Sequence, residues 1–167
     1  RLDYVIVPPS IAMPETMGDM PPESAWLAEQ HGSGTRVCSV CAGAFVLAGT
    51  GLLNGRRATT HWALARPPPP RLPPVDVADR HMVIDDGDII TAGGILAWTD
   101  LGLTLVDRLM GSTIMLATAR FLLIDPPRNL QRPFADFLPP FDHGDAAVLR
   151  VQQHLHAHPG EGLGLTA

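Results

Sequence analysis

The sequence Ser-Val-Cys-Ala-Gly-Ala at residues 39–44 constrains the fold most, because it joins a strand-like apolar run to a helix-like apolar run. Arg36–Val40 is typical of a short buried strand, and residues 42–50 are typical of a helix that ends at Gly51. A chain that passes from strand to helix at one residue holds that residue in a tight, strained turn, and only small neighbours leave room for it. The pattern predicts a nucleophile elbow with Cys41 at its tip.

The two cysteines are expected to differ in chemistry. Cys41 precedes the first turn of the expected helix, where the positive end of the helix dipole lowers the pKa of a thiol. Cys38 lies inside the expected strand, so the C-x-x-C spacing does not place both thiols in one turn. We therefore expect Cys38 to be a buried structural residue.

Composition limits the class of protein. The chain has 167 residues, enough for one domain with a small appendage, and 46% hydrophobic residues supply an aliphatic core. The net charge of −5 disfavours a broad nucleic-acid surface. No apolar run is long enough to span a membrane, no signal peptide is visible, and two close cysteines favour a reducing, cytoplasmic setting. The sequence begins without Met and directly before a strand-like run. We therefore expect that it starts inside a domain.

Strand-like and helix-like segments alternate along the chain. The sequence Asp85-Asp86-Gly87-Asp88 predicts a hairpin turn rather than a calcium loop. Six prolines in residues 67–74 predict an extended surface loop. The order predicts an α/β fold with a mostly parallel sheet. The expected strands are residues 3–7, 36–40, 57–60, 82–84 and 89–92, and the expected helices are residues 22–31, 42–50, 96–110, 114–124 and 146–156.

Several motifs together resemble the PfpI/ThiJ superfamily, and in particular its branch fused to AraC-type regulators. They are residues 38–48 (CSVCAGAFVLA), 51–62 (GLLNGRRATTHW), 90–94 (ITAGG), 97–101 (AWTDL), 122–125 (LLID), 131–134 (QRPF) and the stretch around 143–152. The resemblance implies a flavodoxin-like three-layer α/β sandwich related to class I glutamine amidotransferases. It also implies that the family's first strand, first helix and second strand are missing before Leu2.

The resemblance also implies a domain organisation and a role. Residues 1–127 would form the PfpI/ThiJ-like domain, residues 128–142 a linker, and residues 143–167 the start of an AraC-type helix-turn-helix domain. The expected role is ligand sensing or dimerisation in a transcriptional regulator, as a homodimer with an unknown small-molecule effector. DNA would be bound only through helix-turn-helix elements that this chain lacks, and no membrane, cofactor or metal is expected.

The resemblance assigns a candidate site. Cys41 would be the nucleophile, and His61, after the strand that follows the elbow, would be its base or orienting group. Ala42 and Gly43 would contribute to an anion or ligand site beside the thiol. Gly93 and Gly94 would line a pocket wall through their N–H groups, or simply permit a tight turn.

Alternatives remain open for these residues. Cys41 could be a small residue kept at a strained turn, and His61 could pack with Trp62 and bond the backbone. Pro8-Pro9 replaces the family's Pro-Gly, so Pro9 has no N–H to donate.

The chain shows no acid partner for the thiol, so enzymatic activity stays open. A cysteine-dependent hydrolase or hydratase of the PfpI or isonitrile hydratase type is the alternative function, and a fragment without independent function is a third. His154, His156 and His158 are expected to form a solvated helix end rather than a metal site.

Overall fold

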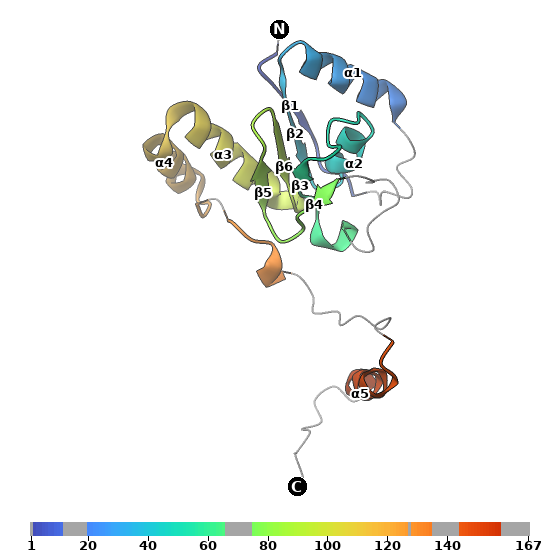
Figure 1. The fold of residues 1–167 in the computed structure, drawn as a ribbon. Coiled ribbons are helices and arrows are strands. Elements are labelled where there is room, and N and C mark those ends of the chain that lie inside the picture. The colour runs from blue at the N-terminus through green and yellow to red at the C-terminus, as the bar shows by residue number, and fades with distance from the viewer. Residues whose placement is uncertain (1, 12–19, 66–74, 127, 135–143, 158–167) are drawn as a thin grey trace. The chain divides into compact units, whose positions relative to one another are not determined.

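The computed structural model describes residues 2–11, 20–65, 75–126, 128–134 and 144–157 (Figure 1). The chain divides into two compact units, Arg1–Ala135 and Asp136–Ala167. The candidate site lies in the first unit, which is therefore described in more detail.

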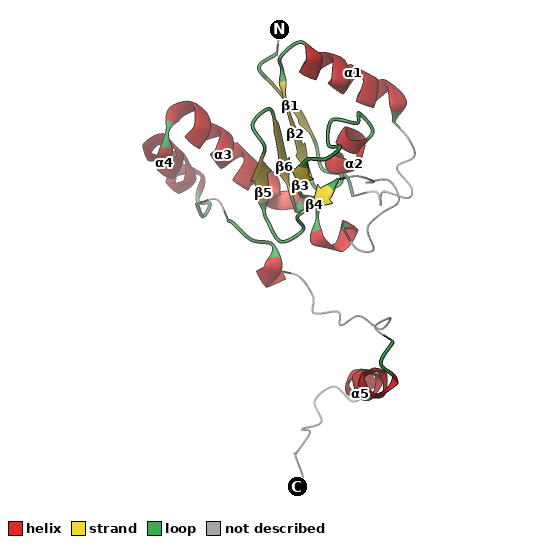
Figure 2. Ribbon diagram, in the orientation of Figure 1, coloured by secondary structure: helices red, strands yellow, loops and turns green. Residues whose placement is uncertain are grey.

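A four-stranded sheet forms the centre of the first unit (Figure 2). Its strand order is β1 (Tyr4–Val7), β2 (Arg36–Val40), β6 (Ile89–Ala92) and β5 (Val83–Asp85). The first three strands run parallel, and β5 runs antiparallel to β6. The hairpin turn between β5 and β6 has Gly87 at φ 87°, which confirms the predicted Asp-Gly turn.

Helices cover both faces of this sheet, which gives three layers (Figure 1). Helices α1 (Pro21–Gly32) and α2 (Gly43–Ala48) cover one face. Helix α3 (Trp98–Met110) covers the other face, and α4 (Ser112–Leu122) packs against α3. The flavodoxin-like α/β fold with a mostly parallel sheet is therefore confirmed.

The alternating side chains of β2 divide the core into two clusters. Val37 packs in the cluster that holds Leu27 of α1 and Leu47 of α2. Cys38 packs in the opposite cluster, which holds Leu101 of α3. Each fully buried aliphatic side chain stabilises the fold by about 1.5–3 kcal/mol. Since both faces of β2 are covered, the strand reads as a continuous apolar run rather than an alternating one.

The strand predicted at residues 57–60 is shorter in the structure. Only β3 (Arg57–Ala58) is extended, and it pairs in parallel with β4 (Asp76–Val77), which the sequence did not predict. Thr59 and Thr60 are buried, and their hydroxyls donate to main-chain carbonyls outside any strand ladder. The Pro-rich run just before β4 lies outside the described residues.

The helix after the elbow and the helix after Gly94 also start later than predicted. The former begins at Gly43 and ends at Ala48, and Gly51 follows at φ 77°. The latter begins with a 3-10 turn, Ile95–Ala97, before α3.

The described part of the second unit contains one helix, α5 (Ala146–Ala157). Asp145 Oδ1 accepts hydrogen bonds from the N–H groups of Ala147 (2.9 Å) and Val148 (3.1 Å) and so caps the N-terminus of this helix. His158 and the tail beyond it lie outside the described residues, as does the side chain of His156. Within the described parts of both units, no helix is long and apolar enough to cross a membrane.

Candidate functional site

Cys41 lies at a sharp turn between β2 and α2. Its φ of 53° is in the left-handed region, which a non-glycine residue rarely adopts. The Cys41 N–H donates to Ala92 O at 2.8 Å, and Thr60 Oγ1 donates to Cys41 O at 2.9 Å. The elbow is therefore fixed on both sides, by the end of β6 and by the chain that follows β3.

Gly43 allows this turn to approach β1. A Cβ built on Gly43 would lie 2.7 Å from Pro8 O and 2.9 Å from Val7 O. Both are main-chain atoms that no side-chain rotation can move. The small residue that the sequence pattern requires after the cysteine is thus explained by close backbone contact.

The electrostatic environment of Cys41 differs from the sequence-based expectation. The side chain is 3% exposed, and burial raises the pKa of the thiol above its ordinary value. The hydrogen bond from the Ala42 N–H to the sulfur acts in the opposite direction but is the smaller effect. The expectation that the helix dipole would lower the pKa was therefore wrong, because desolvation disfavours the thiolate.

Cys38 is fully buried in β2, as predicted. Burial raises the pKa of its thiol to about 12, with a further contribution from the charge of Asp85. Burial therefore raises the pKa of both thiols.

His61 occupies the turn after β3, at the N-cap of the 3-10 helix Trp62–Leu64. Its Nδ1 accepts a hydrogen bond from the Ala63 N–H at 3.1 Å, and burial lowers the pKa of the imidazole. Its ring lies 5.5 Å from that of Trp62. Within the part of the chain that the structure describes, no hydrogen bond joins His61 to the Cys41 sulfur. Of the two interpretations left open, this geometry matches the packed histidine.

Gly93 and Gly94 follow β6 at the same edge of the sheet. The Gly93 N–H donates to Met82 O at 2.8 Å, so it is not free for a ligand. A Cβ on Gly93 would collide with the side chain of Gln131. Gly93 thus serves close packing, whereas Gly94 lines a small cavity together with His61.

Gln131 organises this edge, although the sequence interpretation gave it no role. Its side chain is 2% exposed and makes four hydrogen bonds. Nε2 donates to Thr59 Oγ1, Thr60 O and His81 O, at 2.8–3.0 Å, and Oε1 accepts from the Trp62 N–H at 3.1 Å. Gln131 therefore holds both sides of the turn that carries His61.

Arg128 lies at the N-terminal end of residues 128–134, the segment that also contains Gln131. It bonds the carboxylate of Asp100, a 2%-exposed residue in the first turn of α3, through its main-chain N–H (2.7 Å), Nε (3.3 Å) and Nη2 (2.7 Å). The Phe134 ring lies 5.6 Å from the Arg128 guanidinium carbon. The N-terminal part of the predicted linker, residues 128–134, thus contacts the α/β domain.

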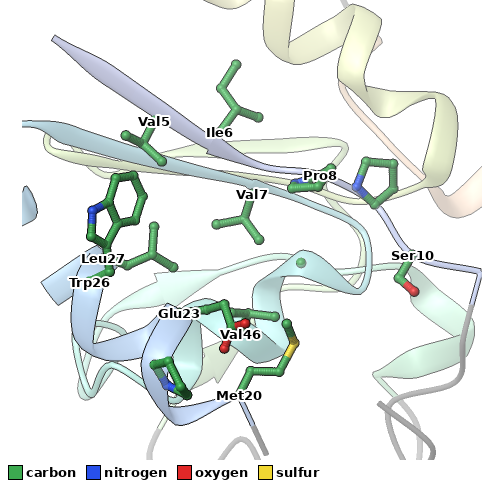
Figure 3. A pocket seen from close by; sticks show the side chains of 13 residues that line it. Val5, Ile6, Val7, Pro8, Ser10, Met20, Glu23, Trp26, Leu27 and Val46 are labelled. Atoms are coloured by element: carbon green, nitrogen blue, oxygen red, sulfur yellow. The ribbon is translucent and has the colours of Figure 1, made fainter. Parts of the chain in front are cut away.

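A large apolar cavity of about 720 Å³ lies along β1 and α1 (Figure 3). Figure 3 shows Val5 and Val7 of β1 on one side of it, and Trp26 and Leu27 of α1 on the other. Gly43 and Val46 of α2 reach this cavity, but Cys41 is not among its lining residues. The resemblance implied a ligand site beside the Cys41 thiol, whereas this cavity is lined by Gly43 and not by Cys41 or Ala42.

A smaller cavity of about 140 Å³ lies where residues 128–134 contact the domain. Cys41 does not line it either. Among the described residues, no group of three or more His, Cys, Asp or Glu side chains is placed to hold a metal ion.

The mostly parallel sheet between helices and the left-handed cysteine between strand and helix define a flavodoxin-like α/β domain with a nucleophile elbow. Residues 1–108 match the DJ-1/PfpI family. The chain therefore belongs to this family.

Two curated relatives and one solved structure show the range of similar proteins. The chain is 38% identical over 143 residues to an isonitrile hydratase of Pseudomonas putida, covering 86% of this chain and 56% of that protein. It is 36% identical over 97 residues to the HTH-type transcriptional regulator ArgR of Pseudomonas aeruginosa, covering 58% of this chain and 29% of the regulator. The crystal structure of Drosophila melanogaster DJ-1beta superposes with a TM-score of 0.63 at 25% identity, covering 75% of this chain and 66% of that one. The chain thus spans little more than half of the hydratase and under a third of the regulator.

Proposed function

We propose that this chain is the ligand-sensing or dimerisation part of an AraC-type transcriptional regulator. In this proposal residues 1–127 sense, residues 143–167 begin the DNA-binding domain, and the protein works in the cytoplasm as a homodimer with a small-molecule effector. DNA is bound through a helix-turn-helix domain outside these residues. The similarity to a helix-turn-helix regulator supports this proposal.

The observation that carries the proposal is the state of the Cys41 thiol. A cysteine nucleophile reacts as its thiolate, usually activated by a base within hydrogen-bond reach. Here burial raises the pKa of Cys41, and the imidazole of His61 accepts a backbone N–H instead. An elbow without an activated thiol favours a binding role over turnover.

The test begins with the reading frame that encodes this chain. We expect the frame to continue past Ala167 into two helix-turn-helix units, and the complete product to protect a specific site in its own upstream DNA. Cys41→Ser should retain that protection, because the thiol is not required for DNA binding. A frame that encodes no DNA-binding domain would overturn the regulator proposal.

A hydratase function is the second candidate, and two observations favour it. The elbow keeps the strained φ of a working nucleophile, and the similarity to an isonitrile hydratase covers 86% of the chain. In that reaction water adds across the isonitrile carbon, R–NC plus H₂O giving R–NH–CHO. Cys41 would add its sulfur and its proton to the isonitrile carbon to give a thioimidate, R–N=CH–S–Cys41, while the Ala42 N–H stabilises developing negative charge. Water would then add to the same carbon, and the C–S bond would break to release the formamide and the thiol.

Formamide production from cyclohexyl isonitrile distinguishes the two candidates. The sensor proposal predicts no turnover above that of a Cys41→Ser variant. The matched control is Cys38→Ala, which leaves the elbow intact. Turnover that survives Cys38→Ala and disappears in Cys41→Ser would establish the hydratase function instead.

A further inference from the structure

The small cavity beside His61 is formed by two parts of the chain that are far apart in sequence. One wall comes from the turn after β3 and from residues 94–97, just before α3, and the other comes from residues 128–134. The latter residues lie beyond the segment that matches the family. The residues that matter for its chemistry are His61, Trp62, Leu96, Arg128, Gln131 and Phe134.

The polar groups of this cavity are donors. Because His61 Nδ1 accepts the Ala63 N–H, the neutral imidazole carries its proton on Nε2. Arg128 uses its main-chain N–H, Nε and Nη2 on Asp100, and Nη1 takes no part in those bonds. The amide of Gln131 is fully used within the protein. A ligand must therefore supply hydrogen-bond acceptors.

The size of the cavity restricts the ligand further. Its volume of about 140 Å³ corresponds to roughly five water molecules at liquid density, so it accepts a ligand of about that many non-hydrogen atoms. The rings of Trp62 and Phe134 line the same space and favour a short apolar tail. A guanidinium group matches the planar geometry of a carboxylate.

We propose that this cavity binds a short-chain carboxylate of two or three carbons, with Arg128 and His61 as the donors to its oxygens. Residues 128–134 lie against the bound ligand and lead directly into Asp136–Ala167, the second unit. Occupancy therefore stabilises the docked state of these residues. The regulatory meaning of that change rests on the proposed function, whereas the binding site does not.

The affinity is expected to be modest. Asp100 already neutralises much of the Arg128 charge, and a ligand of this size has few atoms to contribute. We expect a Kd of about 1 mM or weaker.

An NMR titration of the ¹⁵N-labelled chain with propanoate tests the site. Saturable shifts are expected for the Trp62 indole N–H and the Gln131 side-chain amide, at constant ionic strength. Propanamide, which has the same shape without the charge, should bind at least tenfold more weakly. Exchange of the Gln131 N–H, bonded to Arg80 O, and of the Met82 N–H, bonded to Asn129 O, should slow with propanoate.

Two variants locate the response. Leu96→Trp fills the cavity from an exposed position and should abolish the shifts without unfolding the protein. The double variant Asp100→Asn with Arg128→Gln removes the charge pair together, so that no buried carboxylate is left alone. The double variant should weaken the binding of propanoate at least tenfold, whereas Arg120→Gln on α4 should leave the affinity unchanged.

Each result of these titrations bears on the proposal. Equal binding of propanoate and propanamide would overturn the carboxylate class. Shifts that do not saturate, or that persist in Leu96→Trp, would overturn the site. DNA binding by the complete product is measured separately, so a failed titration leaves the regulator proposal intact, and a failed DNA test leaves the binding site intact.

Discussion

The elbow at Cys41 and the hydrogen-bond network of Gln131 hold the same edge of the sheet by different means. The elbow is local, since a few consecutive residues set the turn and Gly43 lets it approach β1. The network is non-local, since one amide joins segments up to 72 positions away in sequence. The local turn depends on the size of a few neighbouring residues, whereas the Gln131 hydrogen bonds form only once the whole domain has folded.

Gly43→Ala should give the largest effect, because it tests the local half of this comparison. The added Cβ meets the carbonyl oxygens of Val7 and Pro8, so we expect a loss of about 3 kcal/mol in the free energy of unfolding. Urea denaturation measures it.

Gly32→Ala is the matched control for that variant. Nothing lies within 4 Å of a Cβ at Gly32, so alanine should be neutral or stabilising by up to about 1 kcal/mol. Equal effects at the two glycines would contradict the close approach of the elbow to β1.

Gln131→Ala tests the non-local hydrogen-bond network and should lower the free energy of unfolding by about 2 kcal/mol. It removes the hydrogen bonds that Nε2 donates to Thr60 O and His81 O, although Thr59 Oγ1 still donates to His81 O at 2.9 Å and water entering from the adjoining cavity offsets part of the loss. Asn129→Ala, at an exposed side chain of the same segment, should stay within about 0.5 kcal/mol. If Gln131→Ala lowers the free energy of unfolding no more than Asn129→Ala does, the hydrogen bonds of Gln131 do not stabilise the fold.

Alkylation by iodoacetamide sharpens the electrostatic side of the comparison. In a Cys38→Ala background, Cys41 should react more slowly at pH 7 than a free cysteine, because burial raises the pKa of its thiol. The rate should keep rising as the pH passes the ordinary thiol value of 9.0. Rapid alkylation at pH 7 would instead indicate an activated thiol and favour the hydratase candidate.

The smallest effect is expected at the opposite edge of the sheet, where Asp88 bonds Arg56 Nη1 and His31 Nε2, each at 2.6 Å. The hydrogen bond from Arg56 lowers the pKa of Asp88 below its ordinary value of 3.8. This contribution to stability is therefore present above about pH 4 and is lost as the pH falls towards the folded-state value. Because Asp88 is 43% exposed, Asp88→Asn should cost less than about 1 kcal/mol at pH 7.

Asp86→Asn serves as the control for that position, since Asp86 bonds Arg56 at the longer distance of 3.3 Å. The difference between the two variants should narrow as the pH falls from about 4 towards the depressed folded-state pKa of Asp88, because that carboxylate then becomes protonated. A difference that persists in acid would contradict an electrostatic origin.

The sequence predicted the elbow, the hairpin and the layered α/β fold because each depends on neighbouring residues. Small residues around Cys41, the Asp-Gly pair at Gly87 and the apolar runs of the strands are local signals. The direction of the Cys41 pKa shift was missed because burial depends on residues that pack from elsewhere. Gln131 and Asp100 lie in motifs that carried the family resemblance, yet no spacing rule connects them to Thr59 or to Arg128.

The close seating of Gln131 against Gly93 has a practical consequence for dividing the protein. A recombinant fragment cut at residue 108, where the family match ends, would lose α4, Arg128 and Gln131 together. The carboxylate of Asp100 would then lack the guanidinium of Arg128, and Thr60 O, which accepts a hydrogen bond from Gln131, would face solvent. The smallest unit worth expressing alone therefore extends through Phe134.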